Sequence, residues 1–123
     1  MLNIGRIKMI KVITGYTQKS IMDYVLINCS NNYCVEFPEE GRHPKYSCKL
    51  VDDIIDIHKD VVIVTMAECI VNRIGYLIYK GIIDKAVFVQ IDEDGNINTG
   101  EYNEEGFAKG WKMGFFTPDK ISK

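Results

Sequence analysis

Along the chain, short runs made mostly of hydrophobic residues alternate with segments in which hydrophobic residues are periodically spaced. The short, mostly apolar runs are typical of β-strands and lie at 9–14, 33–37, 61–65 and 86–91. Between them, apolar residues recur every three or four positions, which predicts amphipathic helices at 20–29, 44–58 and 65–80. Asp94 and Gly95 then predict a hairpin turn into a last strand at 96–102.

This order of elements sets the expected fold class. The run VVIVT at 61–65 is β-branched throughout, which is typical of a strand covered on both faces in a parallel sheet. Strands that alternate with helices favour an α/β fold with a mostly parallel sheet flanked by helices, here ending in a C-terminal β-hairpin. A chain of 123 residues suits a single domain, 1–123.

The same periodicity predicts which side chains each helix buries. For the first helix these are Ile21, Met22, Val25, Leu26 and Cys29. For the second and third they are Ser47, Leu50, Val51, Ile54, Ile55, His58, Ile70, Ile74, Leu77 and Ile78. Pro44 suits a first helical turn, Thr65 and Glu68 fit a capping box, and Gly81 suits the residue after a helix end.

The composition limits the expected cellular location of the protein and the classes of partner it can bind. A net charge of −2 provides no basic field, so we expect no direct nucleic-acid partner. No stretch reaches the roughly 18 apolar residues of a membrane span, and no secretory leader is evident. The four cysteines form no C-x-x-C pair, which favours reduced thiols in a cytoplasmic protein.

Acidic residues and a histidine gather after the second predicted strand, at Glu36, Glu39, Glu40 and His43. Ligands of α/β sheets bind at the carboxyl ends of strands, and Mg²⁺ is held there by one or two carboxylates and water. The cluster therefore fits either a magnesium site or a solvated acidic turn.

Other candidates are weaker matches to known chemistry. The segment from Asp92 lacks glycine at the sixth position and glutamate at the twelfth, so a calcium loop is not expected. Cys69 has no recognisable catalytic partner and is expected to lie in the core. Trp111 suits either base stacking or anchoring of the tail to the core. The phosphate-binding pattern G-x-x-x-x-G-K-[ST] does not occur.

Four segments, taken together, resemble the C-terminal half of an ABC/SMC-like AAA ATPase, as found in OLD-type and other bacterial defence ATPases. GYTQKS at 15–20 resembles a degenerate signature segment, and CVEFPEEGRHP at 34–44 resembles a Walker B strand with its D-loop. VIVTMAECIVNR at 62–73 resembles a switch segment, and WKMGFF at 111–116 is similar to the close of such chains. The resemblance implies a partial P-loop NTPase fold, an ABC-type lobe without its Walker A loop.

In the Walker B-like segment, Glu36 matches the acid that helps to hold Mg²⁺, which makes it the one weak metal candidate. Phe37 stands where the family has the acid that polarises water. The D-loop-like matches are Pro38, Glu39, His43 and Pro44.

The switch-like segment retains Thr65 and Glu68, whereas Met66 replaces the family's phosphate-sensing histidine and Ala67 its serine. Asn72 and Arg73 also match the switch pattern. The signature-like matches are Gly15, Thr17 and Gln18.

These replacements imply a pseudoenzyme with no catalytic residue, no metal and no cofactor of its own, since ATP and Mg²⁺ would bind only with a partner chain. We expect it to act by protein–protein contact, binding or regulating a complete ABC-type ATPase in a phage or defence system, or associating with itself. One alternative is a fragment of a true ATPase whose Walker A half is a separate chain. A second is a metal-dependent hydrolase that uses Glu36, Glu39 and His43.

Overall fold

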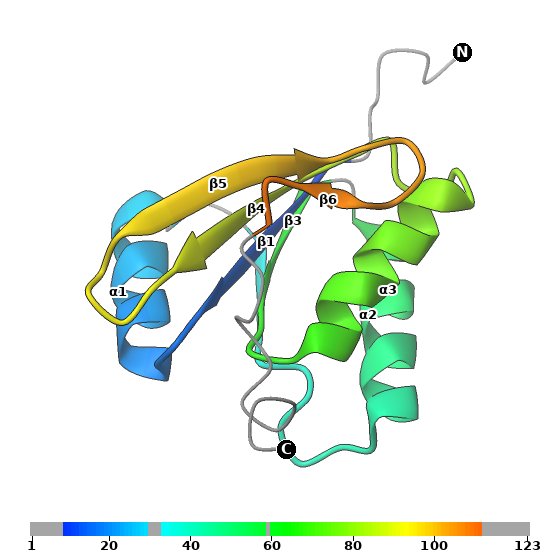
Figure 1. Ribbon diagram of the computed structural model, residues 1–123. Helices are drawn as coiled ribbons and strands as arrows, with labels where there is room; N and C mark the ends of the chain where they lie inside the picture. Colours follow the sequence, from blue (N-terminus) through cyan, green and yellow to red (C-terminus); the bar gives the residue numbers. More distant parts are fainter. Residues whose placement is uncertain (1–8, 30–32, 59, 112–123) are drawn as a thin grey trace, which may run out of the picture.

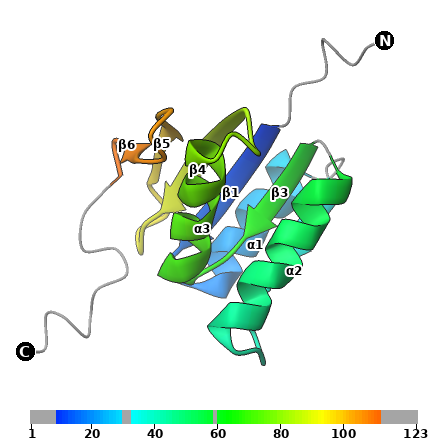
Figure 2. The same cartoon turned by 90° about the vertical axis from the view of Figure 1, so that its right-hand side faces the viewer.

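A computed structural model describes residues 9–29, 33–58 and 60–111, which form a mixed β-sheet with helices on both faces (Figures 1 and 2). The elements follow in the order β1 (Met9–Gly15), α1 (Gln18–Asn28), β2 (Tyr33–Glu36), α2 (Pro44–Ile57), β3 (Asp60–Val64), α3 (Glu68–Tyr79), β4 (Lys85–Ile91), β5 (Ile97–Tyr102) and β6 (Ala108–Lys109). Across these described ranges, no helix is both long enough and apolar enough to cross a membrane.

The strands lie in the order β2-β3-β1-β4-β5-β6. The pairs β2–β3, β3–β1 and β1–β4 are parallel, whereas β5 and β6 are added antiparallel. The predicted turn joins β4 to β5, and Gly95 there has a φ of 85°, a conformation that favours glycine. The expected α/β fold with a mostly parallel sheet and a C-terminal hairpin is thus confirmed.

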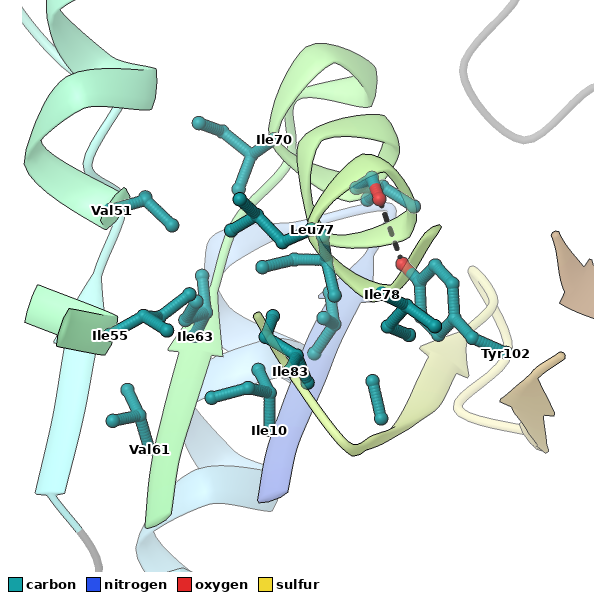
Figure 3. Close-up of a cluster of buried hydrophobic side chains, with 14 of the residues drawn as sticks. Ile10, Val51, Ile55, Val61, Ile63, Ile70, Leu77, Ile78, Ile83 and Tyr102 are labelled. Atoms are coloured by element: carbon teal, nitrogen blue, oxygen red, sulfur yellow. Dashed lines mark hydrogen bonds between the residues drawn. The ribbon is translucent and has the colours of Figure 1, made fainter. Parts of the chain in front are cut away.

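The sheet divides the hydrophobic core into two clusters. The larger cluster lies between the sheet and the pair α2–α3 and includes Ile10, Ile55 and Ile70 (Figure 3). The smaller lies beneath α1, which covers the opposite face and contributes Ile21 and Val25 (Figure 1). Of the faces predicted for α2 and α3, the buried members are Ser47, Val51, Ile55, Ile70, Ile74, Leu77 and Ile78, and the half-buried members are Leu50, Ile54 and His58.

The predicted burial of Leu26 is wrong, because this side chain is 67% exposed. The stripe that α1 turns towards the sheet consists of Ile21, Val25 and Cys29, which are spaced by one helical turn and are buried. Leu26 lies beside this stripe, and a single helix on that face of the sheet leaves it in solvent.

The predicted capping box of α3 is also wrong. The helix begins at Glu68, and its N-cap is Ala67, which makes no side-chain capping bond. Thr65 lies before the helix, and its hydroxyl donates to Glu39 at 2.7 Å. The Thr65 side-chain oxygen accepts the Ala67 amide at 3.0 Å, which lies before the helix, and the Thr65 amide donates to the Ile13 carbonyl instead of to Glu68.

Candidate functional site

Segments far apart in the sequence meet at the carboxyl edge of the parallel strands. Just past β2, the Phe37 amide donates to the Val64 carbonyl at 2.7 Å, and just past β3, the Thr65 amide donates to the Ile13 carbonyl at 3.0 Å. The sheet hydrogen bonding thus continues for one residue beyond each strand. The Walker B-like, switch-like and signature-like segments are consequently neighbours along one edge.

Glu39 bridges the turn after β2 and the segment after β3. Its Oε1 accepts the Thr65 hydroxyl at 2.7 Å, and its Oε2 accepts the Met66 amide at 3.0 Å. Thr65 is completely buried, and its oxygen also accepts the Ala67 amide at 3.0 Å. Both carboxylate oxygens of Glu39 are therefore engaged by the protein itself.

Phe37 occupies the position of the expected water-activating acid, and its side chain lies in the core. It is 8% exposed and belongs to the cluster beneath α1, together with Ile13 and Ile21. Its φ of 50° is in the left-handed region, which is uncommon for a residue other than glycine. Pro38 is buried beside it, and Met66 packs half-buried against the same cluster. None of these three side chains can take a proton from water.

The remaining ionisable side chains of this turn are not gathered into one site. Glu36 ends β2 and is exposed, and its side chain makes no hydrogen bond or ion pair with the described residues. His43 caps α2 through its Nδ1, which accepts the Lys45 amide at 3.1 Å, and Pro44 opens the helix as predicted. In the ranges that the structure describes, no three His, Cys, Asp or Glu side chains are grouped to hold a metal ion. Glu36, Glu39 and His43 are thus not assembled into the metal site that a hydrolase would need.

A second link ties the start of α1 to this turn. Gln18 Nε2 donates to Glu40 Oε2 at 2.6 Å, so the signature-like segment contacts the D-loop-like segment directly. Thr17 is the N-cap of α1 and accepts the Ser20 amide at 3.2 Å. A side chain at Gly15 would collide with α1 and β4. The signature-like residues therefore shape the junction between β1 and α1.

The later residues of the switch-like segment take part in helix packing. Arg73 Nε donates to Asp52 Oδ1 at 2.9 Å and Nη2 to the other oxygen, which joins α3 to α2. Hydrogen bonding to this carboxylate raises the pKa of Arg73. The guanidinium also lies 4.9 Å from the ring centroid of Tyr76. Glu68, in contrast, lines a separate pocket with Trp111.

The four cysteines form no disulfide bonds, and the pKa of two of the thiols is raised. Burial raises the pKa of the Cys48 thiol, with the neighbouring Cys69 as the next cause. Burial likewise raises the pKa of Cys34, with Cys29 beside it. Because the thiolate is the nucleophile, neither Cys34 nor Cys48 is activated for catalysis at neutral pH.

Comparison of the chain with protein-family models, with curated proteins and with solved structures finds no match.

Two surface features were not anticipated from the sequence. Leu26, Ile27 and Ile97 are 67%, 80% and 52% exposed, and we call these three residues the α1 surface. The pocket shared by Glu68 and Trp111 was also missed. The spacing of apolar residues identifies only the buried stripe of a helix, so it does not predict an exposed apolar surface. The pocket brings together Glu68 and Trp111, which are far apart in the sequence.

Replacing Glu39 by alanine is expected to lower the free energy of unfolding by about 1.5–3 kcal/mol, the usual contribution of hydrogen bonds to a charged group. The change removes the acceptor of the Thr65 hydroxyl and of the Met66 amide. Urea denaturation followed by circular dichroism measures the difference.

Glu40→Ala is the matched control, because Glu40 is exposed and its side chain is hydrogen-bonded to Gln18, which is exposed as well. This change should alter stability by no more than about 0.5 kcal/mol. Equal effects of the two substitutions would show that Glu39 does not bridge the two segments.

Proposed function

We propose that this chain is a non-catalytic protein-binding module built like the C-terminal lobe of an ABC/SMC-like ATPase. It acts by docking on another protein, and the partner that the resemblance favours is a complete ABC-type ATPase of a phage or defence system. The observation that carries the proposal is the burial of Phe37 at the position of the water-activating acid.

The contacts at the carboxyl edge of the strands support a structural rather than a catalytic role for these segments. Loss of a general base alone slows a reaction by roughly 10²–10⁴-fold, and phenylalanine has no group that could act as one. Glu39 holds Thr65 and Met66 through both of its oxygens. Glu36 remains exposed, but the 123 residues contain no Walker A pattern to bring a nucleotide phosphate to it.

The arrangement of the segments supports the resemblance itself. Residues that act on one nucleotide must lie together in space, as parallel strands allow at their carboxyl ends. Here the Walker B-like and switch-like segments follow the paired strands β2 and β3, and Glu39 bonds one to the other. This arrangement supports the proposal of an ATPase-like lobe whose catalytic residues have been replaced.

The α1 surface is the proposed docking site. A groove of about 340 Å³ lies between α1 and the β4–β5 hairpin, with Ile27 and Ile97 among its lining residues. Exposed apolar side chains around a groove are typical of protein-binding surfaces. In head-to-tail ATPase dimers, the signature segment faces the other subunit. Since α1 directly follows the signature-like segment, the resemblance would turn this helix towards a partner.

Affinity purification from the native host tests the proposal. The tagged wild-type chain is compared with the double variant Leu26→Asp/Ile27→Asp, and captured proteins are quantified by mass spectrometry. We expect the wild-type chain to capture an ATPase that has a Walker A loop. The double variant should capture at least about tenfold less, since two buried charges in an apolar contact cost more than ~1.4 kcal/mol.

Ile57→Asp is the matched control, because Ile57 is 74% exposed and ends α2 on the opposite face of the sheet. It should capture the same ATPase as the wild-type chain. Capture of no ATPase, or equal capture by the double variant, would refute the proposed docking. A dimer of the chain that the double variant abolishes would assign the α1 surface to self-association.

A further inference from the structure

A second pocket lies on the face of the sheet opposite α1, between α3, β5 and β6. It measures about 260 Å³, and its lining includes Glu68 and Asn72 from α3 and the aromatic residues Tyr102, Phe107 and Trp111. Glu68 and Asn72 come from the switch-like segment, but no residue of the α1 surface and none of the three residues Glu39, Thr65 and Met66 lines this pocket. The pocket therefore requires its own explanation.

The aromatic walls of this pocket are held by the core. The Trp111 ring packs against Phe88 with centroids 5.0 Å apart and planes at 72°. Tyr102 is buried, and its hydroxyl donates to the Val71 carbonyl of α3 at 2.9 Å (Figure 3). Phe107 stands at the rim and is 66% exposed. Rings fixed in this way offer a preformed stacking surface.

The polar groups of the pocket are acidic or neutral. Glu68 and Asn72 are one helical turn apart, so they share a face of α3. The side chains of both are exposed, and within the described chain neither makes a hydrogen bond or ion pair. None of the described lining residues is cationic. The adjacent turn adds the exposed carboxylates of Glu104 and Glu105.

From this geometry we infer that the pocket binds a guanidinium cation. A guanidinium group stacks on aromatic rings and forms paired hydrogen bonds with a carboxylate, which Trp111 and Glu68 supply here. Asn72 adds an amide oxygen as a further acceptor. The apolar stem of an arginine side chain would pack along Phe107 at the rim. An anionic ligand would meet the Glu68 carboxylate and no cationic side chain among the described lining residues. The inference does not depend on the α1 surface or on its partner.

Fluorescence offers a direct test, because Trp111 is the only tryptophan of the chain. The full chain is titrated with N-acetyl-arginine methylamide and, separately, with its neutral isostere N-acetyl-citrulline methylamide. We expect a saturable change with the arginine compound and at least about tenfold weaker binding of the citrulline compound, since only the former pairs with a carboxylate. Equal binding of both compounds, or no saturation with the arginine compound, would overturn the inference.

Matched variants locate the site. Glu68→Gln should weaken binding of the arginine compound by at least about tenfold, whereas Glu104→Gln should change it by no more than about twofold because an exposed charge outside the pocket is screened. Amide NMR shifts of Glu68, Asn72 and Gly106 provide a second readout. Unchanged affinity of Glu68→Gln would overturn the inference, as would saturable binding of adenosine monophosphate that is stronger than that of the arginine compound.

The source of the cation is distinguished by two further ligands, methylguanidinium and the peptide Gly-Arg-Gly. Tighter binding of the peptide by about tenfold or more would identify an arginine of a polypeptide. Equal affinity for methylguanidinium would identify a small guanidino compound. Either result supports a guanidinium site, and binding of neither ligand would refute it.

Discussion

Replacing Phe37 by glutamate is expected to destabilise the fold rather than to restore a catalytic site. The side chain is 8% exposed and packs in the cluster beneath α1. Loss of a buried phenyl ring lowers the free energy of unfolding by about 3–5 kcal/mol, and burial of a carboxylate adds to this loss. Urea denaturation monitored by circular dichroism measures the effect.

Two variants serve as controls for this result. Phe37→Leu keeps an apolar side chain and should cost no more than about 1.5 kcal/mol. Phe107→Glu introduces the same charge at a position that is 66% exposed and should change stability by about 0.5 kcal/mol or less. A Phe37→Glu variant that is as stable as the wild-type chain and hydrolyses ATP with a Walker A-bearing chain would favour the ATPase-fragment alternative.

Replacing Gly75 by alanine is expected to destabilise the protein although alanine is the better helix former. In an ordinary helix interior this change stabilises by roughly 0.5–1 kcal/mol. Here the added methyl group would overlap the backbone carbonyl oxygen of Gly106, where the turn between β5 and β6 rests on α3. Overpacking typically costs about 1–3 kcal/mol, so the effect should reverse in sign.

Tyr79→Ala is the comparison within the same helix, since Tyr79 is 66% exposed. Its unfolding free energy should differ from that of the wild-type chain by no more than about 0.5 kcal/mol. The Gly75→Ala variant should also shift the Trp111 fluorescence, because the displaced turn carries part of the pocket. A Gly75→Ala variant that is more stable than the wild-type chain and has unchanged fluorescence would contradict this prediction. It would show that the β5–β6 turn accommodates the added methyl group without cost.

The fold was largely predictable because most of its elements are local patterns of apolar residues. The buried stripes of α2 and α3 follow helical spacing and are found where they were expected. β6 was not predicted, because its two residues become a strand only by pairing with Glu101 and Tyr102. The exposure of Leu26 was equally hidden, since spacing does not tell which helices share a face of the sheet.

The candidate site was predictable in its residues but not in its contacts. The motif comparison identified Glu39, Thr65 and Met66, yet nothing local indicates that the first binds the other two across more than 25 positions. Residue type alone predicts that Phe37 cannot activate water, whereas its burial depends on the cluster beneath α1. The pocket at Trp111 arises from the packing of β5 and β6 on α3, for which the sequence has no pattern.

Hydrogen–deuterium exchange on the complex between this chain and its captured partner tests the docking proposal most directly. We expect slower exchange at residues 24–28 and around Ile97 when the partner is bound, with little change at 36–40 and 65–67. Protection confined to 36–40 and 65–67, at the carboxyl edge of the strands, would contradict docking through the α1 surface. It would instead favour a nucleotide site shared with the partner at that edge.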